Sequence, residues 1–390
     1  MLFLPLMLTR PVTAAETEVI PSVELRQEYT DNLFLSATQP VSTFITRVSP
    51  GVKATARSER MSGSLAAKLS GFHYSENHSR DSLDQSCEGT GGVQATPQFK
   101  LSGSAAYRKE SSPEQNLETS GQVVNATSWH QIYGSGAEYR IGELTVGSLS
   151  YGYDQTDYGK QIEYSNVTSH NASIGLSHDA DRLLPLLKLR SSARYSRSDY
   201  KTSQVENYEL IIGASRQLHE LWSFSADAGT RYTRSDFQTQ TFDSGTGFGV
   251  RQDQNDSIGW VLATSLDYRG EKLQGSLNFN RDLSTSSGSF GSAVESDVVI
   301  FSLRRQLSYE LFAVLGGGYY RSFANSNQFG SQKVDDTSWR GTFSLRYEFN
   351  RKVSADVGYD YYHLESAASN SYTNRNKVFL QLTAQTTLFE

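Results

Sequence analysis

The sequence predicts an all-β fold, a transmembrane antiparallel up-and-down β-barrel of about eighteen strands. Three observations predict it: polar and apolar residues alternate over segments of about 9–11 residues, aromatic residues often end these segments, and short and long connections alternate along the chain. The composition agrees, because 12% of the 390 residues are aromatic, only 8 are proline and the mean hydropathy is -0.50. Low hydropathy with many aromatic rings is typical of a barrel that has one lipid face and one wet face.

The first residues form an apolar run that is followed by small residues and Ala14-Ala15. This pattern predicts the remnant of a signal peptide over 1–15 and a single outer-membrane β-barrel domain over 16–390. The apolar run is far shorter than the roughly 20 residues that a membrane helix needs. We therefore expect an exported chain of a Gram-negative cell that crosses the outer membrane with strands.

Alternation is clearest between residues 339 and 349, where Trp339, Phe343 and Tyr347 fall on one face and Arg340 and Arg346 on the other. Side chains of a strand point to opposite faces in turn, so aromatic rings and charges occupy different surfaces of the sheet. The same pattern recurs over 222–232, 258–268 and 353–361. A soluble β-sandwich would have strands of about 5–6 residues and an Ile-, Leu- and Val-rich core, so the longer, Tyr- and Gly-rich segments favour the barrel.

The connections give the strand count. Short connections are expected near 57–60, 96–99, 140–144, 179–185, 217–222, 269–272, 307–311 and 349–353. Longer polar connections are expected near 30–43, 75–88, 109–128, 154–166, 197–206, 233–256, 281–296, 323–337 and 363–376. Eight short and nine long connections give eighteen strands with both termini periplasmic, because outer-membrane barrels have short periplasmic turns and longer external loops. Strand patterns are weakest in the first hundred residues, which leaves sixteen strands as the alternative.

The face opposite the aromatic rings carries charges of both signs. An Arg or Lys on the lipid face costs about 2–4 kcal/mol at the bilayer midplane, so we expect these charges to face the lumen. The predicted lumen residues are Arg190, Arg194, Glu209, Asp227, Arg231, Asp267, Arg304, Arg340, Arg346, Glu348, Asp356 and Asp360. They either brace the wall by cross-strand pairing, which we favour for any single residue, or form a constriction that selects solutes by charge. Because the two signs are mixed, no strong ion selectivity is expected.

No motif for chemistry stands out. The chain contains no H-E-x-x-H, G-x-S-x-G or P-loop pattern, and its one cysteine, Cys87, excludes an intrachain disulfide and a CxxC site. The net charge of -6 does not fit a nucleic-acid binder. The sequence thus predicts no enzyme, no cofactor and no metal site, with an outer-membrane hydrolase as the least favoured alternative.

Two short motifs carry a family resemblance: Glu28-Tyr-Thr-Asp-Asn32 and Arg47-Val-Ser-Pro-Gly51. They resemble the outer-membrane β-barrel porins associated with exopolysaccharide and PEP-CTERM (exosortase) systems. The resemblance implies a porin-like channel that takes part in exopolysaccharide export or envelope assembly. Its partners would be outer-membrane lipid, the barrel assembly machinery, polysaccharide and periplasmic export components. The alternative is a plugged, non-conducting barrel with a structural or interaction role.

Overall fold

The computed structural model describes residues 16–111, 126–159, 165–243, 247–284, 293–325, 328–329, 333–367 and 370–388. For 239–243 and 247–248 it describes the backbone alone. The signal-peptide remnant expected over 1–15 lies outside these residues.

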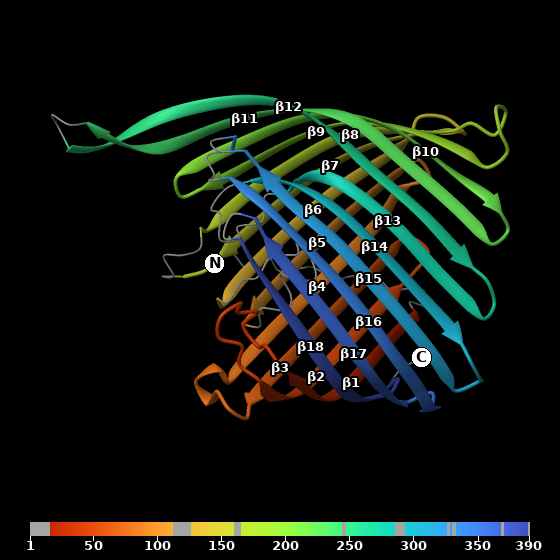
Figure 1. Ribbon diagram of the computed structural model, residues 1–390. Helices are drawn as coiled ribbons and strands as arrows, with labels where there is room; N and C mark the ends of the chain where they lie inside the picture. Colours follow the sequence, from red (N-terminus) through yellow and green to blue (C-terminus); the bar gives the residue numbers. More distant parts are fainter. Residues whose placement is uncertain are drawn as a thin grey trace, which may run out of the picture.

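Eighteen antiparallel strands form one sheet, and β18 pairs with β1, so the sheet closes into a barrel (Figure 1). This confirms the predicted fold and strand count, and the sixteen-strand alternative is wrong. The first nine strands are β1 (Glu16–Thr30), β2 (Thr43–Arg57), β3 (Met61–Tyr74), β4 (Ser82–Thr96), β5 (Phe99–Glu110), β6 (Ser128–Arg140), β7 (Thr145–Asp157), β8 (Val167–Asp179) and β9 (Leu187–Tyr200). The others are β10 (Ser203–His219), β11 (Trp222–Asp243), β12 (Gly247–Arg269), β13 (Leu273–Ser284), β14 (Val294–Gln306), β15 (Leu311–Ala324), β16 (Val334–Asn350), β17 (Val353–Ser366) and β18 (Ser371–Gln385).

Three connections that were predicted to be long are short, so the prediction is wrong for them. Only two residues separate β9 from β10, the β11–β12 ladder continues to the pair Asp243 and Gly247, and β17 reaches Ser366 before β18 starts at Ser371. The polar composition of these segments suggested loops, but a hairpin with water on both faces needs no apolar side chain to keep its backbone ladder. As a result β11 and β12 project beyond the rim of the barrel (Figure 1).

The two ends of the barrel differ. The end with the connections 58–60, 97–98, 220–221 and 351–352 is the short-turn end, and the opposite end is the loop end. Glu16 of β1 pairs with Arg57, and Ala384 of β18 pairs with Val353, so the first and last strands both have their outer termini at the short-turn end. A short helical segment, η1 (His78–Arg80), lies at the loop end between β3 and β4. Among the described residues no helix is long and apolar enough to cross a membrane.

The outer face of the wall is apolar and aromatic. Leu210, Ile212 and Ile258 are 67%, 72% and 84% exposed, and aromatic rings pair across neighbouring strands, as Tyr195 and Tyr208 do at 5.1 Å. A soluble protein rarely leaves so much contiguous apolar surface in water. The apolar side chains are outside and the charges are inside, which is the opposite of a soluble sandwich and suits a wall surrounded by lipid.

The backbones of β10 and β11 approach closely at Gly229 of β11. A Cβ at this position would collide with the carbonyl oxygen of Leu210 and lie 2.9 Å from Cα of Ile211. The close approach of the β10 backbone therefore requires a residue without a side chain.

Replacing Gly229 with alanine should destabilise the barrel by about 1–3 kcal/mol, because the added carbon forces β10 and β11 apart. The matched change is Gly341→Ala on β16, where an added Cβ meets nothing within 4 Å. The midpoint of urea unfolding in detergent and the folded band in unheated gels measure the effect. Equal stability of the two variants would contradict the close approach at Gly229.

Candidate functional site

The predicted lumen residues lie on the inner face of the wall. On β10 the exposed outer residues alternate with inner ones such as Glu209, and the ladder places Arg194 of β9 opposite Glu209. Inner side chains also reach over a whole strand, since Arg190 of β9 contacts Asp227 of β11. Such contacts form on the concave side of a curved sheet, where side chains converge.

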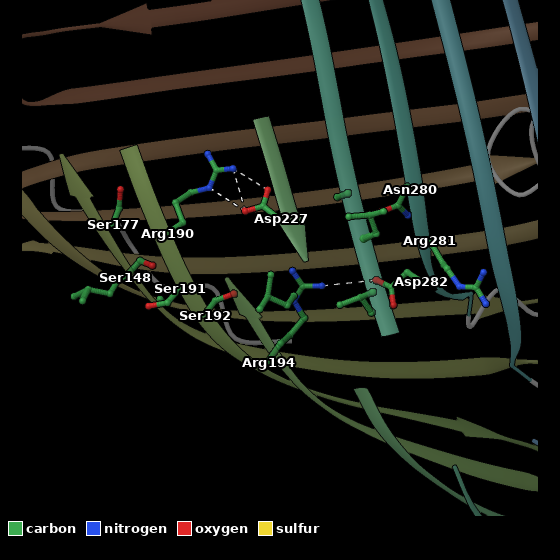
Figure 2. Close-up of a pocket in the computed structure, with 16 residues that line it drawn as sticks. Ser148, Ser177, Arg190, Ser191, Ser192, Arg194, Asp227, Asn280, Arg281 and Asp282 are labelled. Atoms are coloured by element: carbon green, nitrogen blue, oxygen red, sulfur yellow. Dashed lines mark hydrogen bonds and ion pairs between the residues drawn. The ribbon is translucent and has the colours of Figure 1, made fainter. Parts of the chain in front are cut away.

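One group of ion pairs, the β9–β13 cluster, surrounds a cavity of about 320 Å³ (Figure 2). Arg190 donates to Asp227 from Nε at 3.1 Å and from Nη2 at 2.8 Å, a bidentate pair. Arg194 contacts Glu209 at 3.2 Å and reaches Asp282 of β13 at 3.8 Å. Because β9 and β13 are separated by three strands in the sheet, the last contact shows how sharply this part of the wall curves.

Arg231 closes a gap in the wall. The β11–β12 ladder continues far beyond Leu262, where the β12–β13 ladder ends, so β12 leaves β13 at this level. Arg231 is 1% exposed and contacts Glu295 of β14 at 2.7 Å and Asp282 at 3.7 Å. These bonds join β11 to β13 and β14 where the ladder is missing. For Arg231 this geometry favours wall bracing over contact with a solute.

A second group, the closure cluster, joins the last strands to the first. It consists of Arg26 and Glu28 of β1, Asp360 of β17 and Lys377 of β18. Lys377 lies 3.5 Å from Glu28 and 3.4 Å from Asp360, and Arg26 lies 2.5 Å from Glu28. Their side chains are at most 15% exposed, so two cations and two anions neutralise each other with little help from water.

The remaining predicted residues are distributed along the wall. Arg346 pairs with Asp356 at 2.7 Å, and Arg304 with Glu348 at 3.7 Å. Asp267 lines a separate cavity with Lys188 near the short-turn end. Arg340 lies opposite Gly318 and Tyr362 in its ladders. The structure thus gathers some of these residues into clusters and leaves the others spread along the inner face.

Apolar side chains meet inside the loop end of the barrel. Phe329, in the connection between β15 and β16, is fully buried. It belongs to a cluster whose other members come from two separate groups of strands: Val167, Tyr200, Val205, Ala293, Val294, Ala324 and Val334. Val167, Tyr200 and Val205 belong to β8, β9 and β10, whereas Val294, Ala324 and Val334 belong to β14, β15 and β16. Phe329 therefore belongs to a cluster that joins β8, β9 and β10 to β14, β15 and β16. We call this group the outer constriction.

The connection after β1 also folds over the inner face. Leu33 packs against Ile45 and Tyr74, and Leu35 packs against Tyr362. The first resemblance motif holds this connection in place, because Asn32 Nδ2 donates to the hydroxyl of Thr373 at 3.0 Å and to the carbonyl of Ser36 at 2.9 Å. These bonds give the Asp-Asn pair a structural role at the mouth of the barrel.

Sequence reasoning missed the closure cluster and the outer constriction. Arg26 and Glu28 alternate with exposed apolar residues such as Leu25, so the sequence shows which face of β1 they occupy. No local pattern shows that β1 meets Lys377 of β18, because this contact forms only when the barrel closes. The one signal for the constriction was an aromatic residue, Phe329, inside a polar connection. An aromatic ring in such a segment needs an apolar environment, which the interior of the barrel supplies.

The arrangement that comes nearest to a catalytic one differs from a triad in two ways. Ser128 Oγ lies 3.0 Å from His130 Nε2, but Glu110 lies 3.5 Å from the same nitrogen. His130 Nδ1 faces the hydroxyl of Thr156 at 2.9 Å, where a triad would have its carboxylate. Ser128 is also fully buried, so its hydroxyl is closed to a substrate.

Comparison with known proteins agrees with this architecture. Residues 18–172, less than half of the chain, match the family described as "Putative beta-barrel porin 2". No curated protein matches the sequence. The solved structure of OccK2 (OpdF) from Pseudomonas aeruginosa is similar with a TM-score of 0.50 and 9% identity over 96% of this chain and 100% of that one.

Two other solved structures are similar over nearly the whole chain at lower scores. OccAB2 from Acinetobacter baumannii has a TM-score of 0.47 and 10% identity, covering 95% of this chain and 98% of its own. OpdL from Pseudomonas aeruginosa has a TM-score of 0.45 and 10% identity, covering 96% and 99%. At such identities a likeness concerns the fold alone. The family match and the closed eighteen-stranded sheet together support a porin-like outer-membrane β-barrel.

Proposed function

We propose that the chain is a porin-like channel of the outer membrane, with the short-turn end in the periplasm and the loop end outside. The distribution of charge carries this proposal. Apolar and aromatic side chains cover the outer face, whereas residues such as Arg190, Asp227 and Asp267 line the inner one. A wall built in this way encloses a polar path through an apolar layer, and eighteen strands are wide enough for an aqueous channel.

At the loop end of this path lies the outer constriction, a cluster of apolar side chains. Phe329 and the connection after β1 cover part of the inner face at the loop end, while the β9–β13 cluster and its cavity lie below. Solutes would pass the charged side chains of the interior and the apolar side chains of the mouth. This observation also favours the second candidate function, a plugged barrel that acts through its loops without conducting.

We further propose that the channel serves exopolysaccharide export or envelope assembly, with periplasmic export components at the short-turn end. The two resemblance motifs point to this role. Part of the inner wall also suits a polyhydroxylated chain, because it carries small hydroxyl side chains and glycines rather than charges. This hydroxyl wall comprises Ser64, Thr90, Ser102, Ser104, Ser150, Gly152 and Ser173. Hydroxyl groups of the wall and of a sugar can exchange hydrogen bonds without a strong binding site.

Single-channel recording in planar bilayers tests the proposal. A conducting barrel should give steady current steps, and a polysaccharide that enters the lumen should block them. Silence from protein that is shown to be folded would overturn the channel and leave the plugged barrel. Steps that no polysaccharide blocks would keep the channel and reject the export role.

Neutralising Asp227 should shift the ion preference of the channel towards anions. Asp227→Asn leaves the Arg190 guanidinium without its carboxylate, which adds one net positive charge to the inner face. The reversal potential across a salt gradient measures the shift, best at about 0.01 M salt where a charge acts over about 30 Å. The control is Glu271→Gln in the exposed turn after β12, which should have a smaller effect. Equal shifts would mean that Asp227 does not face the ion path.

A further inference from the structure

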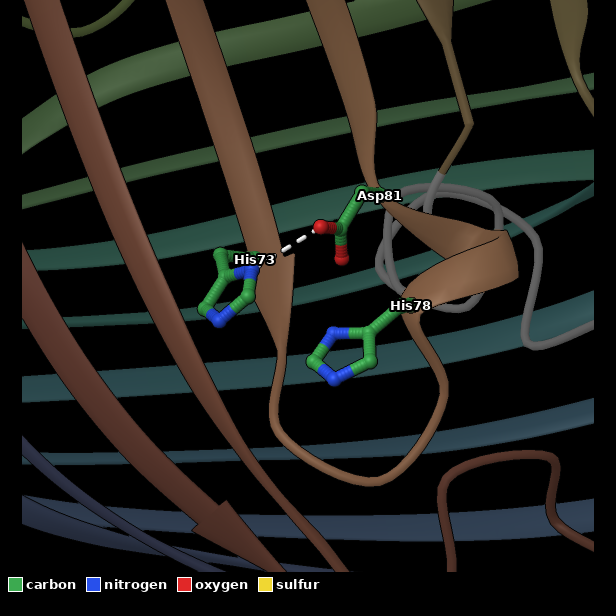
Figure 3. Close-up of side chains that lie close together, drawn as sticks. All are labelled: His73, His78 and Asp81. Atoms are coloured by element: carbon green, nitrogen blue, oxygen red, sulfur yellow. Dashed lines mark hydrogen bonds and ion pairs between the residues drawn. The ribbon is translucent and has the colours of Figure 1, made fainter.

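Two histidines and a carboxylate meet at the loop end, outside the charged interior described above. His73 ends β3, His78 begins η1, and Asp81 closes the connection before β4 (Figure 3). Each residue offers one ligand atom, and these atoms lie within 4.8 Å of one another. All three side chains are exposed, so an ion from solution can reach them.

The carboxylate is already held in position. Asp81 Oδ1 accepts the backbone N–H of Tyr74 at 2.9 Å, and Oδ2 lies 2.8 Å from His73 Nδ1. The Tyr74 N–H and, after it, the His73 side chain lower the pKa of the Asp81 carboxyl, so the group stays ionised. Because Tyr74 is buried against Leu33 and Ile45, the backbone that orients the carboxylate is fixed.

The two imidazoles lie side by side. The ring centroids of His73 and His78 are 5.2 Å apart with an interplanar angle of 23°. In Figure 3 the His78 ring lies below and to the right of the His73 ring, with Asp81 above both.

Two nitrogens and one carboxylate oxygen are a ligand set that zinc and copper accept. A tetrahedral zinc ion with ligands at about 2.0–2.1 Å needs donor atoms about 3.3 Å apart. The His73–Asp81 contact is already shorter than this, and rotation of the exposed His78 ring would bring the third ligand closer. The fourth position would be left to water.

We propose that His73, His78 and Asp81 form a binding site for a divalent transition-metal ion, with zinc or copper as occupant. The ion takes the place between His73 Nδ1 and Asp81 Oδ2, where the free protein has a hydrogen bond. Asp81 Oδ1 keeps its bond to Tyr74, and His78 brings η1 onto the ion. Metal binding then fastens the connection between β3 and β4, whose Arg80 guanidinium lies over the ring of Phe34 at 5.1 Å. The sequence predicted no metal site, because the three residues fit no metal-binding motif.

Calorimetric titration of Zn²⁺ into the full chain, refolded in detergent, tests the site. One equivalent should bind, and His78→Ala should weaken binding by more than about tenfold, because it removes a direct ligand. The matched control is His219→Ala at the short-turn end, which should bind as the unchanged protein does. Equal affinity of the His78→Ala and His219→Ala variants would overturn the site.

Two further readouts separate ligation from loose association. Cu²⁺ bound to the unchanged protein should show nitrogen couplings from two imidazoles by electron paramagnetic resonance, and His73→Gln should leave one. Zn²⁺ should also slow tryptic cleavage after Arg80 without affecting cleavage after Arg60 at the opposite end of the barrel. Couplings from two imidazoles in the His73→Gln variant would overturn the proposal, and so would unchanged cleavage after Arg80.

Discussion

Replacing Phe329 with alanine should open the outer constriction and raise the single-channel conductance. The ring is fully buried between strands β8 to β10 and strands β14 to β16. Truncating a buried phenylalanine removes about 3–5 kcal/mol of packing free energy. If that energy holds the Phe329 ring in the cluster, the equilibrium between the covered and uncovered mouth should shift by more than about a hundredfold. Current steps that are larger or that stay open longer would show this change.

The matched control is Phe343→Ala on β16. Phe343 lies on β16, the strand that follows Phe329 in the chain, and is 47% exposed on the outer face. Removing its ring therefore affects the contact with lipid and not the mouth of the barrel. The control should keep the conductance of the unchanged protein. A Phe329→Ala channel with unaltered conductance would contradict a constriction at this position, and a change of equal size in both variants would point to general damage.

Replacing Lys377 with methionine should destabilise the barrel by about 3–5 kcal/mol. The variant removes the cation that contacts both Glu28 and Asp360 and leaves two buried carboxylates with Arg26 as a shared partner. An uncompensated buried charge is more damaging than the loss of the pair itself. The midpoint of urea unfolding in detergent, followed by tryptophan fluorescence, measures the loss.

Two variants make this result specific to the closure cluster. Lys188→Met removes an exposed pair with Asp179 at 3.4 Å, which should matter by at most about 1 kcal/mol. Adding Asp360→Asn to the Lys377 variant should restore part of the stability, because Arg26 and Glu28 then remain as one balanced ion pair. Equal losses for Lys377→Met and Lys188→Met would contradict the strong coupling that we describe.

The strand count and the two faces of the wall were predictable from local patterns. A strand such as β16 shows its faces in the sequence itself, since Trp339 and Phe343 alternate with Arg340 and Arg346. Lengths of connections were less predictable. The polar residues of the β11–β12 hairpin lack a pattern because neither of its faces meets lipid, and their ladder depends on backbone hydrogen bonds alone.

The clusters inside the barrel could not be predicted, because they join residues that only closure brings together. Glu28 and Lys377 lie at opposite ends of the sequence, and Phe329 shares an apolar cluster with Val205, which lies 124 residues earlier in the chain. Arg231 was predicted on the inner face, but its place in the wall depends on the point where β12 leaves β13. Such contacts follow from the curvature of the whole sheet, which no single strand pattern contains.

The position of β1 sets an order for the assembly of the wall. Thr30 pairs on one side with Thr43, a neighbour in sequence, and on the other with Lys377, which lies almost the whole chain away. One edge of β1 must therefore wait until every later strand has been made. A chain cut before β18 would keep two bare edges, and bare edges pair readily with other chains. Pairing of β18 with β1 is thus the last step of assembly, and it removes both free edges from the sheet.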